Sequence, residues 1–64
     1  MTLAELRNAA GLKQVDVARK MNLDQSTVSS WEIGKNKPLA KNRKRLAKLY
    51  CVSVDELNMA IDGN

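Results

Sequence analysis

The sequence predicts an all-α fold, a compact bundle of five short helices that forms a single domain over residues 1–64. Apolar residues recur at helical spacing between short polar breaks, which is the pattern of amphipathic helices. Only three glycines and one proline are present, too few for the many turns of a β-sandwich or barrel. A chain of this length has room for one small domain with a thin core.

Residues that begin and end helices locate the first two helices of the chain. Thr2 to Glu5 matches a capping box, which predicts a first helix that begins there and stops at Gly11. A second helix is expected from about Gln14 to Met21, with Val17, Ala18 and Met21 on its apolar face.

The third helix is expected from Gln25 to about Ile33, with Val28 and Trp31 buried. Asn22 tolerates the left-handed conformation of a turn, and Asp24 is a residue type that caps helices. Because only about three residues separate the second and third helices, the segment of about 14–33 predicts a helix-turn-helix.

Two further helices complete the bundle. Gly34 to Pro38 breaks the chain before a fourth helix, Leu39 to Tyr50, which turns Leu46, Ala47, Leu49 and Tyr50 inward. Ser53 to Glu56 predicts a second capping box, and the fifth helix that it opens carries Val54, Leu57 and Ile61 as apolar residues.

Positive charge is concentrated in one stretch. The formal net charge is +4, and no acidic residue lies between Glu32 and Asp55. Within that gap fall seven of the basic residues: Lys35, Lys37, Lys41, Arg43, Lys44, Arg45 and Lys48. Such a stripe is typical of a protein that binds a phosphate backbone.

The outward face of the third helix carries small polar side chains and no charge. It consists of Gln25, Ser26, Ser29 and Ser30, with Thr27 toward one side. These side chains can donate and accept hydrogen bonds, as the reading of base edges in a major groove requires. An ordinary solvated helix face more often carries Glu and Lys, so this face favours insertion into a groove.

Several function classes are excluded by residue types. The chain has no histidine, a lone Cys51 and no nucleophile–base pair, so we expect no enzyme, metal site, cofactor or small-molecule substrate. No apolar run reaches the length of a membrane span, and an acidic N-terminus does not resemble a secretory signal. A single cysteine suits a reducing compartment, so we expect a cytoplasmic protein.

From Gly11 to Lys35, and on through Leu57, the chain resembles the Cro/C1-type helix-turn-helix family, the lambda-repressor-like DNA-binding domains. Gln14 with Ala18, and Gln25-Ser26-Thr27-Val28 with Trp31 and Glu32, carry the resemblance most specifically. The resemblance implies base contacts by Gln25, Ser26, Ser29 and Ser30. It implies phosphate contacts by Gln14, Thr27, Lys35, Asn36, Lys37 and Lys41. It also implies a structural ion pair between Arg7 and Glu32.

Four positions depart from the family pattern. Asn22 replaces the glycine usual in the turn between the second and third helices, which is a mild change. Cys51 stands where glycine is usual after the fourth helix, so we expect the turn there to differ, because a left-handed residue with a Cβ is unfavourable. Ala40 and Arg43 stand where larger apolar residues are usual, so we expect the fourth helix to be weakly anchored at its start. Arg43 must either run over the core to solvent or turn toward DNA.

These observations favour a sequence-specific regulator of transcription that binds double-stranded DNA, a repressor that occupies a palindromic operator as a homodimer. The resemblance implies a bacterial or phage-encoded protein. We expect its dimer to form at least on DNA, with Leu57, Met59 and Ile61 of the fifth helix as the candidate contacts. The alternative is a protein-interaction module on the same scaffold, an antitoxin or assembly adaptor, which would use an apolar patch and tolerate neutralisation of the basic loop.

Overall fold

A computed structural model describes residues 1–63, and within them the chain forms five α-helices and no strand. The helices are α1 (Leu3–Ala9), α2 (Gln14–Met21), α3 (Gln25–Glu32), α4 (Ala40–Tyr50) and α5 (Val54–Asp62). The predicted all-α bundle is therefore confirmed. Ile33 and Leu39 lie just outside α3 and α4, as the residues that cap them. No helix of the described chain is long and apolar enough to cross a membrane.

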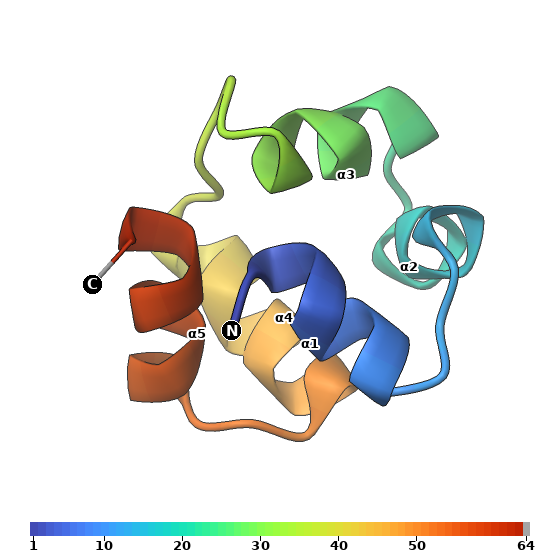
Figure 1. The fold of residues 1–64 in the computed structure, drawn as a ribbon. Helices are drawn as coiled ribbons and strands as arrows, with labels where there is room; N and C mark the ends of the chain where they lie inside the picture. Colours follow the sequence, from blue (N-terminus) through green and yellow to red (C-terminus); the bar gives the residue numbers. More distant parts are fainter. Residues whose placement is uncertain (64) are drawn as a thin grey trace.

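Helix α1 holds the bundle together. Figure 1 shows α1 passing in front of α4, with α5 to one side, α2 to the other and α3 along the edge above them. Helix α1 packs against α3, α4 and α5, while α2 packs mainly on α3 and α4 mainly on α5. The buried core draws on every helix: Leu3, Leu6, Val17, Ala18, Met21, Val28, Trp31, Leu46, Ala47, Tyr50 and Leu57.

Local hydrogen bonds begin most of the helices. In α1, the Glu5 amide donates to the Thr2 hydroxyl (3.1 Å) and the Thr2 amide donates to the Glu5 carboxylate (2.7 Å), which is the predicted capping box. Ser53 caps α5 by accepting from the Glu56 amide (3.0 Å). Asp24 occupies the N-cap position of α3, but its side chain makes no capping bond there, contrary to expectation.

Every helix ends beside a residue in the left-handed conformation. Asn22 takes this role after α2 (φ 57°), as predicted, and the following amide of Leu23 donates to the Ala18 carbonyl (2.8 Å). Cys51 does the same after α4 (φ 59°), so the expectation of a different turn is wrong. The Val52 amide donates to the Ala47 carbonyl (2.9 Å), and this bond closes the turn. Cys51 is strained there, because its Cβ makes the left-handed conformation unfavourable.

Arg43 anchors the start of α4, so the expectation of a weak attachment is also wrong. Its guanidinium turns neither to solvent nor toward α3. It donates instead to the carbonyl oxygen of Pro38 and to side chains of Asn58 and Asp62 on α5. Hydrogen bonds thus replace the apolar contacts that the resemblance implied for this position.

Replacing Cys51 by glycine is expected to stabilise the fold by about 0.5–1 kcal/mol. Glycine removes a left-handed strain of about 1–2 kcal/mol, and the greater freedom of the unfolded chain offsets about 0.4–1 kcal/mol of that gain. Urea unfolding measures the effect as a higher midpoint at constant slope. Cys51→Ala is the matched control, because it removes the thiol and keeps the Cβ, and it should leave the midpoint near that of the wild type. A lower midpoint for Cys51→Gly would show that the turn is unstrained.

Candidate nucleic-acid interface

Helix α3 presents one apolar face to the core and one polar face outward. Val28 and Trp31 are buried, while Gln25 and Ser26 are exposed. Ser29, Ser30 and Thr27 are half-buried at the sides of the outward face. Eight residues give a helix about 12 Å long, comparable with the width of about 12 Å of a DNA major groove. The helix lies along one edge of the molecule in Figure 1, so no other element covers its outward face.

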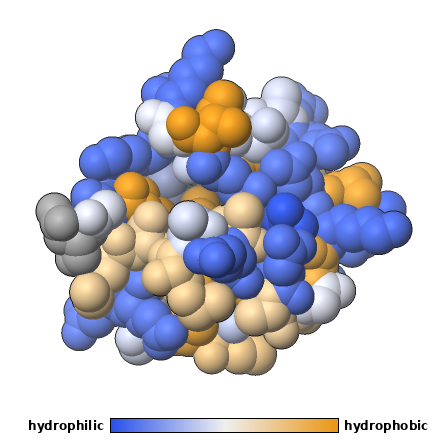
Figure 2. Space-filling model, in the orientation of Figure 1, coloured by the Kyte–Doolittle hydropathy of each residue, from blue (hydrophilic) through white to orange (hydrophobic). Residues whose placement is uncertain are grey.

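The basic residues predicted to contact phosphate lie beside the end of α3. Gly34 is left-handed there, and the amides of Lys35 and Asn36 both donate to the Ser30 carbonyl, at 3.0 and 3.3 Å. These bonds hold the loop against the last turn of the helix. Lys35, Asn36 and Lys37 are exposed, as is Lys41 in the first turn of α4. Figure 2 shows hydrophilic side chains around a strongly apolar group in this region. Ile33 and Leu39, at the two ends of the loop, are 72% and 78% exposed.

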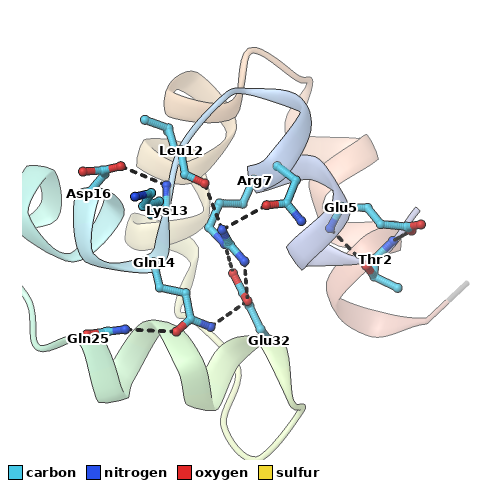
Figure 3. Close-up of polar contacts among 10 residues, drawn as sticks. Thr2, Glu5, Arg7, Leu12, Lys13, Gln14, Asp16, Gln25 and Glu32 are labelled. Carbon is cyan, nitrogen blue, oxygen red and sulfur yellow. Dashed lines mark hydrogen bonds and ion pairs between the residues drawn. The ribbon is translucent and has the colours of Figure 1, made fainter.

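A shielded ion pair joins α1 to the end of α3. Arg7 Nε lies 2.6 Å from Glu32 Oε2, and Arg7 Nη2 donates to Glu32 Oε1 at 3.3 Å. The Arg7 and Glu32 side chains are only 13% and 6% exposed. Arg7 Nη1 also donates to the Leu12 carbonyl (2.8 Å), so the guanidinium ties the α1–α2 connection to α3 as well (Figure 3). The hydrogen bond with Glu32 raises the pKa of Arg7 further above its ordinary value.

From Glu32 a second chain of hydrogen bonds runs back to the start of α3. Gln14 at the first position of α2 donates through Nε2 to Glu32 Oε1 (2.9 Å). Gln25 Nε2 in turn donates to Gln14 Oε1 at 3.4 Å (Figure 3). An ionised carboxylate only accepts hydrogen bonds, so Glu32 fixes which end of the Gln14 amide faces it. The Gln14 oxygen then selects the nitrogen end of Gln25.

Sequence reasoning missed this link between the two glutamines. The resemblance implied separate roles for Gln14 at phosphate and Gln25 at a base, and the structure places their amides in contact. The two residues are eleven positions apart, on different helices, and no local spacing rule pairs them. The signal that could have found them is that each opens a helix of the same helix-turn-helix, which brings the two helix starts together.

Tyr50 lies on the core side of the Arg7–Glu32 pair. Its hydroxyl is buried and has no hydrogen-bond partner among residues 1–63. Burial, with a smaller contribution from the negative charge of Glu32, raises the pKa of Tyr50 to about 12, so the phenol stays neutral near pH 7.

The comparisons with known proteins agree with this architecture. The helix-turn-helix family model matches residues 3–57, and the chain belongs to that family. It is also 33% identical over 55 residues to the HTH-type transcriptional activator BcrR of Enterococcus faecalis. Those residues cover 86% of this chain and 27% of that relative, so the chain spans about a quarter of the relative's length. No solved structure matches the chain significantly. Family and relative together support DNA binding and transcription regulation as the class of function.

Removing the charge of Glu32 is expected to cost about 3–5 kcal/mol of unfolding free energy in the variant Glu32→Gln, because Arg7 then keeps a shielded charge without its partner. Native domains are stable by only about 5–15 kcal/mol, so the melting temperature should fall steeply. Circular dichroism on heating measures this change. Glu56→Gln, an exposed carboxylate on α5, is the matched control and should stay within about 0.5 kcal/mol of wild type. Equal stabilities of the two variants would contradict a structural role for the pair.

Proposed function

We propose that this domain binds double-stranded DNA in a sequence-specific manner and regulates transcription, with α3 inserted in the major groove. The observation that carries the proposal is the hydrogen-bonded series Glu32–Gln14–Gln25, which orients an exposed amide at the start of an uncharged, small polar helix face. Orienting a side chain before binding lowers the entropy lost in the complex. A merely solvated helix face has no need of an oriented amide.

Gln25 is the main base-reading residue in this proposal. Its Nε2 donates one hydrogen bond to Gln14, and the second N–H and the carbonyl oxygen remain available to a ligand. One donor beside one acceptor matches the N7 and N6 positions of adenine. Ser26, Ser29 and Ser30 offer single hydrogen bonds or close packing along the same face, and Thr27 stands toward its side, beside phosphate or a thymine methyl.

Backbone contacts come from both sides of α3. At the start of α2, Gln14 keeps a second amide hydrogen beyond the one given to Glu32, and free N–H groups at a helix start favour an anion. Beyond α3, the exposed Lys35, Asn36 and Lys37 and the nearby Lys41 supply positive charge and donors. Phosphates on the two edges of the groove would thus be held by α2 on one side and by the loop on the other.

A dimer assembled on a palindromic operator fits this domain better than one held by α5. Leu57 is fully buried, so it cannot contact a partner as expected from the sequence, and Ile61 is half-buried against the core. Met59 alone of the three is exposed, at 60%, in a groove between α1 and α5. Glu5 and Glu56 line that groove, so two copies meeting there would bring like charges together. Figure 2 shows weakly apolar surface over these two helices.

The direction of regulation depends on where the operator lies. We propose repression, by a cytoplasmic protein that covers promoter DNA and excludes polymerase. The relative from Enterococcus faecalis is named an activator, so a reporter gene with the operator at different distances from the promoter is the appropriate test of direction.

Selection from a pool of random duplexes tests the proposal as a whole. We expect enrichment of a palindromic sequence with half-sites about one helical turn apart. Enrichment of one unpaired half-site would remove the dimer and leave sequence-specific binding. Failure to enrich any sequence, at salt low enough for non-specific binding, would overturn the proposal and favour the protein-interaction module.

Replacing Gln25 by alanine is expected to cost about 1–3 kcal/mol of binding free energy on the selected operator and to relax preference at one base pair of each half-site. Affinity for scrambled duplex should hardly change, because the variant loses no charge. Fluorescence anisotropy against both duplexes at one salt concentration measures the difference. Gln14→Ala serves as the comparison. It should cause a smaller loss of specificity, because the Gln25 amide is then no longer oriented by the Gln14 oxygen. Equal losses of Gln25→Ala on both duplexes would reassign Gln25 to the backbone.

Replacing Lys35 by alanine should weaken binding to all sequences alike. Loss of one phosphate contact lowers the slope of log affinity against log salt concentration by about 1. Titrations of operator and scrambled duplex at several salt concentrations measure the slope. Lys48→Ala removes an exposed charge from the far end of α4, beside Lys20 and Arg45, and should leave the slope unchanged. A change of sequence preference in Lys35→Ala would show that this lysine reads a base.

A further inference from the structure

The loop between α3 and α4 is the longest connection in the described chain. It spans residues 33–39, whereas the other connections span residues 10–13, 22–24 and 51–53. Its first half is held by the bonds from Lys35 and Asn36 to the Ser30 carbonyl. Its second half, which runs from Lys37 to Leu39, needs some other support. The loop as a whole carries three of the proposed backbone contacts, which are Lys35, Asn36 and Lys37.

Arg43 supplies that support from the first turn of α4. Its Nε donates to the Pro38 carbonyl at 2.8 Å. Its Nη1 donates to Asn58 Oδ1 at 3.0 Å and to Asp62 Oδ2 at 3.2 Å, both on α5. The side chain is 18% exposed, so little water competes for these bonds. One guanidinium therefore connects the end of the loop to two turns of α5.

A second tie runs to the same carboxylate from the loop itself. Lys37 Nζ lies 3.3 Å from Asp62 Oδ1, and both side chains are about half exposed. Hydrogen bonds from Arg43 and then from Lys37 lower the pKa of Asp62, so the carboxylate stays charged at neutral pH. The exposed pair contributes little to stability by itself. Arg43 is the less exposed of the two partners of Asp62, at 18% against 57% for Lys37.

We propose that Arg43 is a positioning residue for DNA binding, one that fixes the Pro38 carbonyl to α5 and so sets where Lys35 and Lys37 meet the phosphate backbone. The proposal rests on the proposed function, because it assigns a role in the same DNA interface. In this proposal Arg43 makes no contact with DNA, because four of its five N–H donors are engaged by Pro38, Asn58 and Asp62. A loop ordered in advance loses less entropy on binding than a free one.

The decisive variant is Arg43→Leu, which offers an apolar anchor for α4 and removes the side-chain hydrogen bonds to Pro38, Asn58 and Asp62. Arg45→Leu is its matched control, because it removes the same charge from an exposed side chain two residues along. Arg45 lies beside Lys20 and Lys48, outside the loop, and no phosphate contact is assigned to it. We expect Arg43→Leu to keep a cooperative melting transition and to bind selected operator and scrambled duplex about tenfold more weakly. Its salt slope should fall by about 2, one for each of Lys35 and Lys37, whereas the control should keep the wild-type slope.

Amide hydrogen exchange separates positioning from loss of charge. In the free protein, the Lys35 and Asn36 amides should exchange about tenfold faster in Arg43→Leu than in Arg45→Leu, while core amides of α1 exchange alike. Arg43→Lys provides a second test if the leucine variant fails to fold. A single ammonium keeps the charge but cannot hold Pro38 and Asp62 in the fork geometry of arginine, so a smaller loss of the same kind is expected.

The outcomes distinguish the two proposals. Wild-type protein that bound no duplex would overturn both. Wild-type binding together with equal affinities, salt slopes and exchange rates for Arg43→Leu and Arg45→Leu would overturn the positioning role alone, and would leave Arg43 as a structural residue. Reduced binding with faster loop exchange in Arg43→Leu, and in neither wild type nor control, is the result that supports it.

Discussion

The ion pair between Arg7 and Glu32 is the interaction on which the rest of the structure depends. It joins the helix that packs on α3, α4 and α5 to the last residue of α3. Taking two charges out of water is costly, and the cost is offset here because each charge is further hydrogen-bonded: Arg7 to the Leu12 carbonyl and Glu32 to Gln14. Geometry at the pair is therefore transmitted directly to the side chains that open α2 and α3.

Polar networks supply the precision that a small core cannot. Eleven buried apolar residues fill the interior, and apolar packing of this size sets the general positions of five helices. Arg7 then positions Gln14 through Glu32, and Arg43 holds the Pro38 carbonyl at the end of the α3–α4 loop, so the two arginines support the two ends of the proposed interface. Arg7 lies on α1, which packs on α3, and Arg43 lies on α4, which follows the loop after α3, so both supports come from outside the proposed reading surface.

The parts of the fold that depend on neighbouring residues could be predicted from the sequence. Thr2 and Glu5 cap each other within one turn, Asn22 takes the left-handed conformation that suits it, and Val28 with Trp31 marks the buried face of α3. The family resemblance predicted the ion pair between Arg7 and Glu32, which no local pattern in the sequence connects.

The parts of the fold that depend on distant residues could not be predicted from the sequence. Arg43 is nineteen positions from Asp62, and a basic residue in a basic stretch gives no sign of a carboxylate partner. Cys51 is left-handed because α4 and α5 are each fixed by the core, which leaves a three-residue connection no other path despite the local cost. Asp24 has the residue type of a cap without its bond, since the backbone there is already placed by the turn from α2.

The differing connection lengths bear on how such a domain can diverge. Three joints are short and close on left-handed residues, so an insertion there would re-aim a helix and disturb the core. The segment from residue 33 to residue 39 is longer and solvent-exposed except at Pro38, and its two ends are held by Ser30 and by Arg43. Related sequences could therefore change the length or the charge of the middle of that segment without displacing the helices. We expect it to be the connection that varies most among them.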